Sequence, residues 1–277
     1  MFRDEGRSSA VPQVRAGENG SLRMPLQISP KFRRVFPRLC GFFLLLSLGS
    51  LCAEQLPEMR PALLGTGPKS LINLIDTESL MKRGQTDALV MFSYGVGASG
   101  HCYTTVTYRG TPNSTPLAEE TVYKCDRAIF IPAVYQHKTR DALISGTIIF
   151  EVINGKPHLR IYLNQETGHL KQRDDFISPQ AVFIYDAKYK PFQFPQKGRG
   201  FSGTVVVTLN VDATGKLNSS KLVFESPPGR GFGDEVMSKI GSNTFLPGYL
   251  HGKPVACSAT LQLLTRPGGR THWKTDQ

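Results

Sequence analysis

Several residue patterns that mark common functional sites are missing from this chain. None of its six histidines stands at a spacing typical of metal ligands, and no two cysteines have zinc-finger spacing. No basic stripe is interleaved with aromatic residues, as nucleic-acid binding would require. We therefore expect no metal site, no cofactor and no nucleic-acid partner. The histidines are His101, His137, His158, His169, His251 and His272.

Catalytic pairs are missing as well. Glu119 and Glu120 are adjacent, and neighbouring side chains on a helix point about 100° apart, so they do not form a facing acid-base pair. His251 stands six residues before Cys257, but the Gly-Lys-Pro turn between them fixes no geometry, and a loop histidine is the simpler interpretation. We therefore expect that the protein is not an enzyme.

The apolar run at residues 39–53 is short for a membrane-spanning helix, which needs roughly 17 to 25 residues. Basic residues precede it and small residues follow, as in a secretory signal peptide. We therefore expect an exported protein with a signal peptide over residues 1–53, and Met24 is an alternative natural start. An uncleaved run anchored in the inner membrane is the alternative. The preceding basic residues are Lys31, Arg33, Arg34 and Arg38.

The remaining composition is that of a globular protein. The net charge is +11, but the first 38 residues hold eight Lys or Arg against three Asp or Glu, which leaves only +6 for the rest. The length of 277 residues allows one or two domains, and the 40% hydrophobic content is compatible with a sizeable core.

Residues 203–265 carry the pattern of two strands, a helix and a further strand. Residues 203–211 alternate β-branched and polar types, an Asp-Ala-Thr-Gly turn follows, and residues 216–224 run back as a hairpin. After a Pro-Pro break, apolar residues at helical spacing predict a helix over 233–241. Residues 255–264 alternate again and predict the last strand. The helical apolar residues are Phe232, Val236, Met237 and Ile240.

The same pattern recurs, weakened, at residue numbers lower by 115. Eleven identities cover the 57 positions from 82 to 138, where chance would give about four. Gly100, for example, corresponds to Gly215 at the hairpin turn. We interpret this as an internal duplication; two similar strand-helix plans with accidental identities are the alternative. The identical residues in the first repeat are Lys82, Val90, Val96, Ala98, Gly100, Pro112, Glu120, Lys124, Phe130, Pro132 and Lys138.

The first repeat ends differently from the second. Residues 143–153 predict a long strand, Asn154-Gly155 is the strongest short hairpin signal, and residues 158–163 alternate back. The predicted organisation is a signal peptide (1–53), an N-terminal segment (54–81), a divergent domain with an extra hairpin (82–165), a connector (166–190), a second domain (191–265) and a tail (266–277).

The second repeat resembles the C-terminal domain of TonB, the periplasmic energy transducer of Gram-negative bacteria. The resemblance covers about residues 190–265, and by internal repetition it extends more weakly to residues 82–150. The matching residues are Gln193, Phe194 and Pro195 before the first strand, residues 203–215 over the hairpin, Phe232, Glu235 and Val236 in the helix, and Phe245, Leu246 and Pro247 after it.

This resemblance implies an α+β fold of two TonB-like domains, each a small antiparallel sheet packed with a helix. In that family the segment with the aromatic-proline pair pairs with an extended peptide of an outer-membrane receptor, which implies a partner-binding role for Phe194 and Pro195. The helical stretch that usually follows this pair is shortened to residues 196–201, and the long Pro-rich spacer of TonB is missing. Both departures weaken the case for energy transduction.

Two cysteines occupy core positions in the repeat comparison. Cys102 and Cys125 correspond to Leu217 and Ile240, which are both apolar, so one cysteine falls on the hairpin and the other on the helix. In an exported protein this pair predicts a disulfide across the helix-sheet interface, worth roughly 3 kcal/mol. Two buried free thiols are the alternative. Cys257 is expected to be a buried free cysteine.

Together these patterns predict a periplasmic binding or scaffold module that recognises a protein or peptide, such as an outer-membrane protein, through an exposed sheet edge. The candidate edges are residues 255–264 and the segment near Phe194. Alternatively, the two repeats cover each other's edges. A membrane-anchored TonB-type energy transducer is the second hypothesis, and contact with the membrane is expected only if the signal segment stays uncleaved.

Overall fold

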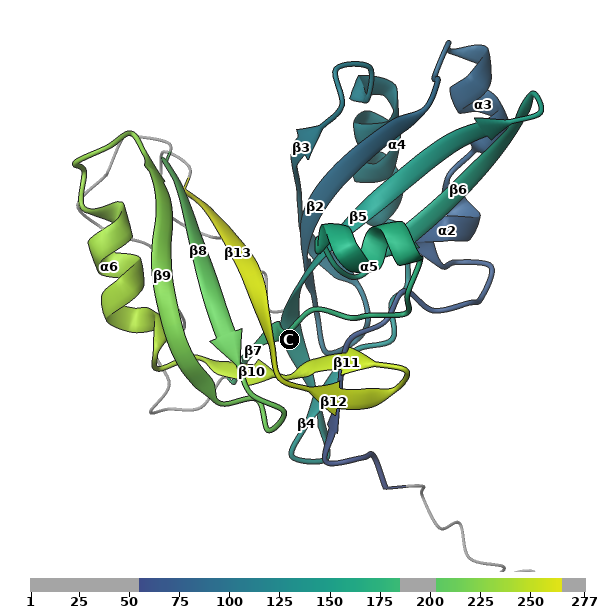
Figure 1. Ribbon diagram of the computed structural model, residues 1–277. Helices are drawn as coiled ribbons and strands as arrows, with labels where there is room; N and C mark the ends of the chain where they lie inside the picture. The colour runs from purple at the N-terminus through teal and green to yellow at the C-terminus, as the bar shows by residue number, and fades with distance from the viewer. Residues whose placement is uncertain (1–54, 185–202, 266–277) are drawn as a thin grey trace, which may run out of the picture. The chain divides into compact units, whose positions relative to one another are not determined.

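The computed structural model describes residues 55–184 and 203–265 (Figure 1). Of these residues, 47% lie in strands and 19% in helices. The signal peptide predicted over residues 1–53 lies outside the described residues. No helix in the described ranges is both long enough and apolar enough to cross a membrane.

The larger sheet has eight strands among the described residues and curls into a half barrel. Its central path runs β1-β4-β5-β2-β3, and β6 and β7 pair with β5. Asn154 and Gly155 both have positive φ, as a two-residue hairpin turn requires, and they join β5 to β6. The strands are β1 (Met59–Arg60), β2 (Ala88–Val96), β3 (Cys102–Gly110), β4 (Ala133–Tyr135), β5 (Lys138–Ile153), β6 (Lys156–Tyr162), β7 (Gln180–Phe183) and β10 (Thr244–Leu246).

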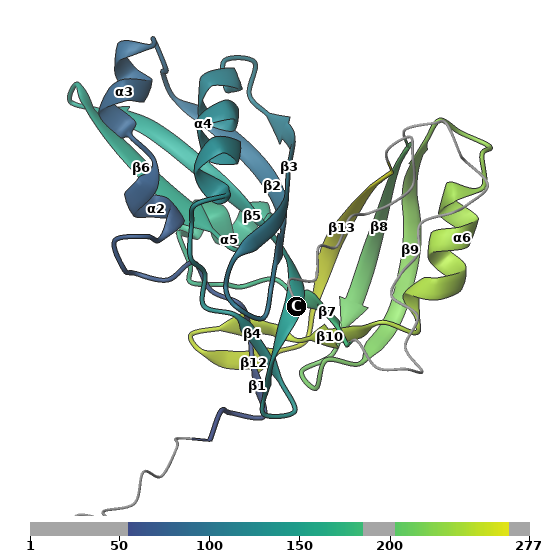
Figure 2. The ribbon, with the colours of Figure 1, turned by 180° about the vertical axis from the view of Figure 1, so that it is seen from behind.

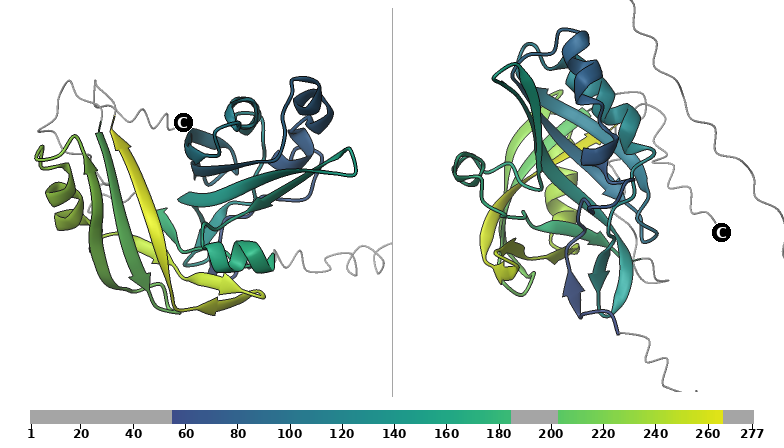
Figure 3. Two further views of the ribbon diagram at one scale, coloured as in Figure 1. Left: turned by 45° about the horizontal axis from the view of Figure 1, so that its top comes forward. Right: turned by 90° about the vertical axis from the view of Figure 1, so that its right-hand side faces the viewer.

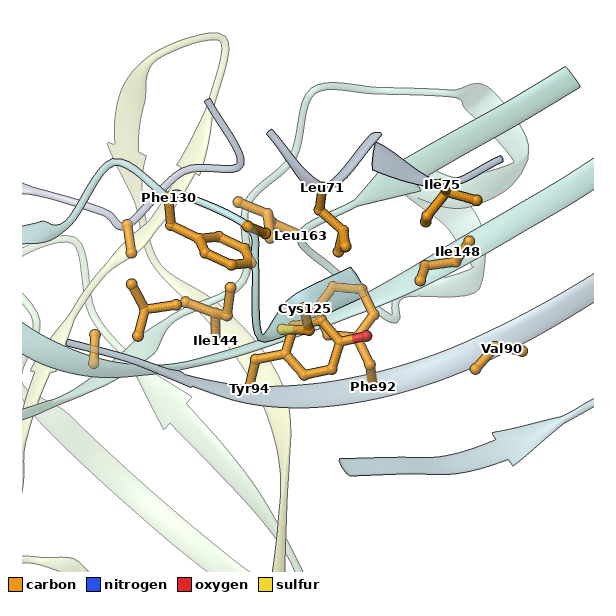
Figure 4. Close-up of a cluster of buried hydrophobic side chains, with 14 of the residues drawn as sticks. Leu71, Ile75, Val90, Phe92, Tyr94, Cys125, Phe130, Ile144, Ile148 and Leu163 are labelled. Atoms are coloured by element: carbon orange, nitrogen blue, oxygen red, sulfur yellow. The ribbon is translucent and has the colours of Figure 1, made fainter. Parts of the chain in front are cut away.

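The main hydrophobic core lies on this sheet. Phe92 and Tyr94 of β2 stack on each other and are fully buried, together with Ile144 and Ile148 of β5 (Figure 4). Leu71 packs into the same core from a short helix. The four helices in this part of the chain are α2 (Leu71–Leu74), α3 (Thr77–Lys82), α4 (Thr115–Cys125) and α5 (Thr167–Gln172).

A second sheet has three strands in the order β13-β8-β9. Alternate residues of β8 are buried, and they contact the apolar side of helix α6 (Phe232–Ile240), which lies along β8 and β9 (Figure 2). This burial fits the period-two pattern of the sequence. The remaining strands are β8 (Gly203–Val211), β9 (Leu217–Ser226), β11 (Gly248–Leu250), β12 (Lys253–Val255) and β13 (Cys257–Thr265).

The predicted fold of two separate TonB-like domains, each a small sheet packed with a helix, is wrong. β7 pairs with residues 141–143 of β5 and also with β10, which belongs to the predicted second domain. Strands from both predicted domains therefore share one curled sheet. The reason is that β2 pairs with only one edge of β5, so the backbone groups on the other edge of β5 need further strands, which β6 and β7 supply.

The two repeats nevertheless match in register. A shift of 115 residues carries the bounds of β2 onto those of β8. It also carries the pair Val96 and Ala142 onto Val211 and Cys257, and Ala88 and Phe150 onto Gly203 and Thr265. The two register shifts between β2 and β3 recur at the same shift between β8 and β9. We propose that this agreement reflects the internal duplication predicted from the sequence.

Candidate functional site: an open strand edge and a thiol pair

Strand β13 is the predicted edge strand near residues 255–264. It pairs with β8 over nine consecutive residue pairs without a register shift. Within the described ranges it has no strand on its other side. Figure 3 shows it at the margin of the three-stranded sheet. We call this side of β13, over residues 257–265, the open edge.

Strand β13 itself lacks several of the features that usually protect an edge strand. Its nine residues include no proline and no charged residue. The opposite edge strand, β9, is interrupted by two register shifts and carries Lys221 and Glu225. Charges and bulges discourage edge-to-edge pairing, so β13 is the better template for another strand.

The corresponding edge in the first repeat is covered by the chain itself. There, β5 takes the place of β13, and its outer side pairs with β7 at residues 141–143 and with β6 at residues 147–153. Both covering strands run antiparallel to β5. The first repeat thus shows that this type of edge accepts a further antiparallel strand.

The backbone groups that point outward from β13 follow from the ladder. The Thr111 N–H donates to the Leu89 carbonyl at 3.0 Å, so the backbone N–H and C=O groups of Leu89 point toward the β3 side. Backbone groups alternate along a strand, so those of its neighbours Ala88 and Val90 point toward β5. At a shift of 115 residues, Ala88 and Val90 correspond to Gly203 and Val205. The odd-numbered residues of β8 and their odd-numbered partners in β13 therefore form the backbone hydrogen bonds between these two strands. The N–H and C=O groups of Ser258, Thr260, Gln262 and Leu264 therefore face outward.

The side chains of β13 alternate between two environments. Ala259 and Leu261 are buried. Leu261 belongs to the hydrophobic cluster that β8 and α6 form, which we call the second core, and the partly exposed Leu263 packs against it. Ser258 and Thr260 point to the other face and are exposed. A strand added at the open edge would therefore continue an apolar face on one side and a polar face on the other.

The predicted cysteine pair meets in the main hydrophobic core, which we call the first core. The Cys125 thiol of α4 donates a hydrogen bond to the Cys102 sulfur of β3 at 2.9 Å. Both are free thiols in the structure, so the predicted disulfide stays a prediction. Figure 4 shows the Cys125 sulfur beside the ring of Tyr94, and the buried Tyr94 hydroxyl has no hydrogen-bond partner among the described residues.

The two thiols of this pair differ in acidity. The hydrogen bond that Cys125 donates lowers the pKa of Cys102, while the same bond, together with burial, raises the pKa of Cys125. Burial also raises the pKa of Cys257. Cys102 is therefore the thiol that we expect to ionise first, and it is partly exposed, as Cys257 is.

We expect iodoacetamide to modify Cys102 before Cys257 when the reduced protein is treated at pH 7. The thiolate is the reactive form, and each unit of pKa difference changes its fraction about tenfold. Peptide mapping by mass spectrometry would measure both rates. Cys125→Ala removes the donated hydrogen bond, so it should slow modification of Cys102; equal rates at Cys102 and Cys257 in the wild type would contradict this assignment.

No protein-family model matches this chain, and neither does any curated protein. The TonB resemblance therefore stays a prediction. Phe194 and Pro195, to which it assigned partner binding, lie outside the described residues. The open edge rests on other residues: alternation predicts a strand over residues 255–264, and the small sheet that the resemblance implies makes this strand a candidate edge.

His251 has a partner other than Cys257. Its ring Nδ1 lies 2.9 Å from the Asp175 carboxylate, and its backbone N–H donates to the same carboxylate at 3.1 Å. His251 also has a positive φ of 52°, which fits the turn between β11 and β12. These contacts fit the predicted loop histidine.

Proposed function

We propose that this protein is an exported binding module whose open edge accepts an extended segment of a protein partner in the periplasm. The observation that carries the proposal is the contrast between two equivalent edges. The β5 edge is covered by β6 and β7, whereas the β13 edge has no strand on it among the described residues. From the TonB resemblance the proposal keeps only the mode of recognition, which is strand addition.

The affinity in this mode comes from backbone hydrogen bonds, and each contributes roughly 0.5 to 1.5 kcal/mol net. The outward groups of Ser258, Thr260, Gln262 and Leu264 supply four donors and four acceptors. Pockets for alternate side chains add specificity. A partner segment should therefore be recognised by its extended backbone first and by its apolar residues second.

Replacing Thr260 by proline should block the open edge and leave the β8 pairing intact, because the Thr260 N–H points outward. We expect peptides selected from a displayed library on the wild-type chain to bind Thr260→Pro at least about tenfold more weakly, a loss of one to two hydrogen bonds. Isothermal titration calorimetry would measure the change, and circular dichroism would confirm that the variant folds.

Ser220→Pro is the matched control at the opposite edge. Even-numbered residues of β8 bond β9, where Thr208 pairs with Lys221 and Asn210 with Ser219. The Ser220 N–H therefore points away from the sheet, as that of Thr260 does at the other edge. Peptides should bind Ser220→Pro like the wild type. Equal binding to Thr260→Pro and wild type, or the absence of any binder sensitive to this edge, would overturn the proposal.

A further inference from the structure

We propose that the open edge pairs with the same edge of a second molecule of this chain, so that two three-stranded sheets join into one of six strands. This inference rests on the proposed strand addition and names its partner. It is carried by three properties of β13: the phase of its backbone groups, the sequence of its side chains, and the way such a pair closes.

One antiparallel register pairs all nine residues of β13 with their counterparts. It sets Cys257 opposite Thr265 of the second molecule and places the two-fold axis at Leu261. In this register Thr260 stands opposite Gln262, and both point their N–H and C=O groups outward. Each such pair exchanges two hydrogen bonds, as in any antiparallel ladder. In this register the outward donors and acceptors of one β13 therefore face those of the other.

The side chains fit the same register. Leu261 meets Leu261 of the second molecule, and Leu263, which is partly exposed, meets Ala259. No residue of β13 carries a charge, so no like charges oppose each other across the pair. The first repeat shows the same chemistry, because the strands that cover β5 place aliphatic residues opposite its core-facing positions.

Three cross-strand pairs of β5 show this preference. Their members are Ala142 with Val182, Ile148 with Ile161, and Phe150 with Leu159. Val182 is fully buried, and Ile161 and Leu159 pack against the first core. Aliphatic residues at every second position are thus the pattern that such an edge takes, and β13 itself has this pattern in Ala259, Leu261 and Leu263.

A two-fold pair is a closed dimer that cannot grow into a longer chain, because each molecule uses its open edge in the one contact. A head-to-tail chain would instead join β13 to a different segment of the next molecule, and the repeat points to the equivalent of β7 as one such segment. Ile131 corresponds to Leu246 at the shift of 115 residues. Ile131 forms a bridge with Leu63, and Leu246 pairs with Gln180 at the start of β7, so the segment that follows Leu63 is the equivalent of β7. Gly65 there has a φ of 72°, so this segment is not extended as β7 is. A two-fold pair needs no such further strand, since β13 alone supplies both edges of the contact.

Such an edge-to-edge contact is small, and interfaces below about 1,000 Å² are typically weak. We therefore expect a dimer that forms with rising concentration. Sedimentation equilibrium of the full chain should show concentration-dependent dimers for the wild type and for Ser220→Pro. Thr260→Pro should weaken the dimer by about tenfold or more.

Residue-resolved amide hydrogen exchange tests the site directly. In dilute protein the outward amides of Ser258, Thr260 and Gln262 should exchange fast, whereas those of Ala259 and Leu261 are already bonded to β8. On concentration, exchange at these three outward amides should slow about tenfold or more. Their unchanged exchange, or dimers that persist fully in Thr260→Pro, would overturn self-pairing.

The two proposals fail separately in these experiments. If selected peptides bind the open edge but the outward amides stay unprotected at high protein concentration, self-pairing is wrong and strand addition stands. If neither peptides nor a second molecule protect these amides, strand addition itself is wrong. Protection on concentration that a selected peptide competes away would support both.

Discussion

Gly215→Ala is expected to lower the free energy of unfolding by about 2 to 5 kcal/mol. Gly215 has a φ of 87°, a conformation that costs an alanine about 1 to 2 kcal/mol. A Cβ atom there would also overlap the carbonyl oxygen of Phe245, a backbone atom that cannot rotate away. Forcing such an overlap typically adds about 1 to 3 kcal/mol. Chemical denaturation of the wild type and the variant would measure the difference.

Gly252→Ala separates the two contributions. Gly252 has a φ of 72°, but a Cβ atom there would meet nothing within 4 Å. We expect this control to cost only the conformational part, about 1 to 2 kcal/mol. Equal losses in Gly215→Ala and Gly252→Ala would show that the contact with Phe245 does not matter.

The first repeat offers the same comparison. Gly100 has a φ of 84°, and a Cβ atom on it would overlap the Phe130 carbonyl oxygen. Gly155 has a φ of 72° and open space around it. If the repeats are built alike, Gly100→Ala should cost as much as Gly215→Ala, and Gly155→Ala as little as Gly252→Ala. A large difference between the two repeats would contradict their equivalence at the hairpin.

Oxidation of Cys102 and Cys125 to a disulfide should raise the free energy of unfolding by about 3 kcal/mol, because it closes a loop of moderate length in the unfolded chain. The two sulfur atoms already lie 2.9 Å apart, so bond formation needs only a small approach. For a domain of this size the midpoint of thermal unfolding should rise by about 6 to 12 °C. Thermal denaturation with and without a reductant would measure this shift, after a non-reducing peptide map has identified the bond.

The second repeat supplies the control for this bond. Leu217 and Ile240 stand where the first repeat has Cys102 and Cys125, and both pack in the second core. The double variant Cys102→Leu, Cys125→Ile should keep an apolar contact and lose all dependence on the reductant. Exported protein in which Cys102 and Cys125 are unlinked would rule out the disulfide, and a linked protein with an unchanged midpoint would contradict the stabilisation.

Much of the local structure could be predicted from particular residues. Asn154 and Gly155 form the hairpin turn that they predicted, because both can adopt positive φ. The predicted helix over residues 233–241 is α6 with a shift of one residue. The shift of 115 residues also predicted that Cys102 and Cys125 lie at core positions, because they correspond to the apolar Leu217 and Ile240. In the structure the two sulfur atoms lie 2.9 Å apart.

The covering strands could not be predicted in the same way. β7 lies within the predicted connector (166–190), and nothing in its four residues indicates that it pairs with both β5 and β10. The hairpin partner β6 was expected, but its role in covering an edge became visible only beside the uncovered β13. The contrast between the covered β5 edge and the open edge of β13 could therefore not be predicted from the sequence.

The sequence by itself determined the order strand, strand, helix and final strand of the second repeat, the Asn154-Gly155 hairpin turn, the repeat interval and the two positions of the thiol pair. These depend on interactions between residues close in the chain or on a pattern written twice. Only the tertiary structure decided that both halves share a curled sheet, and that one of two equivalent edges is covered while β13 pairs on one side among the described residues. The reason is that strand pairing between distant segments depends on which backbone groups other strands leave unpaired, and no local pattern of side chains records this.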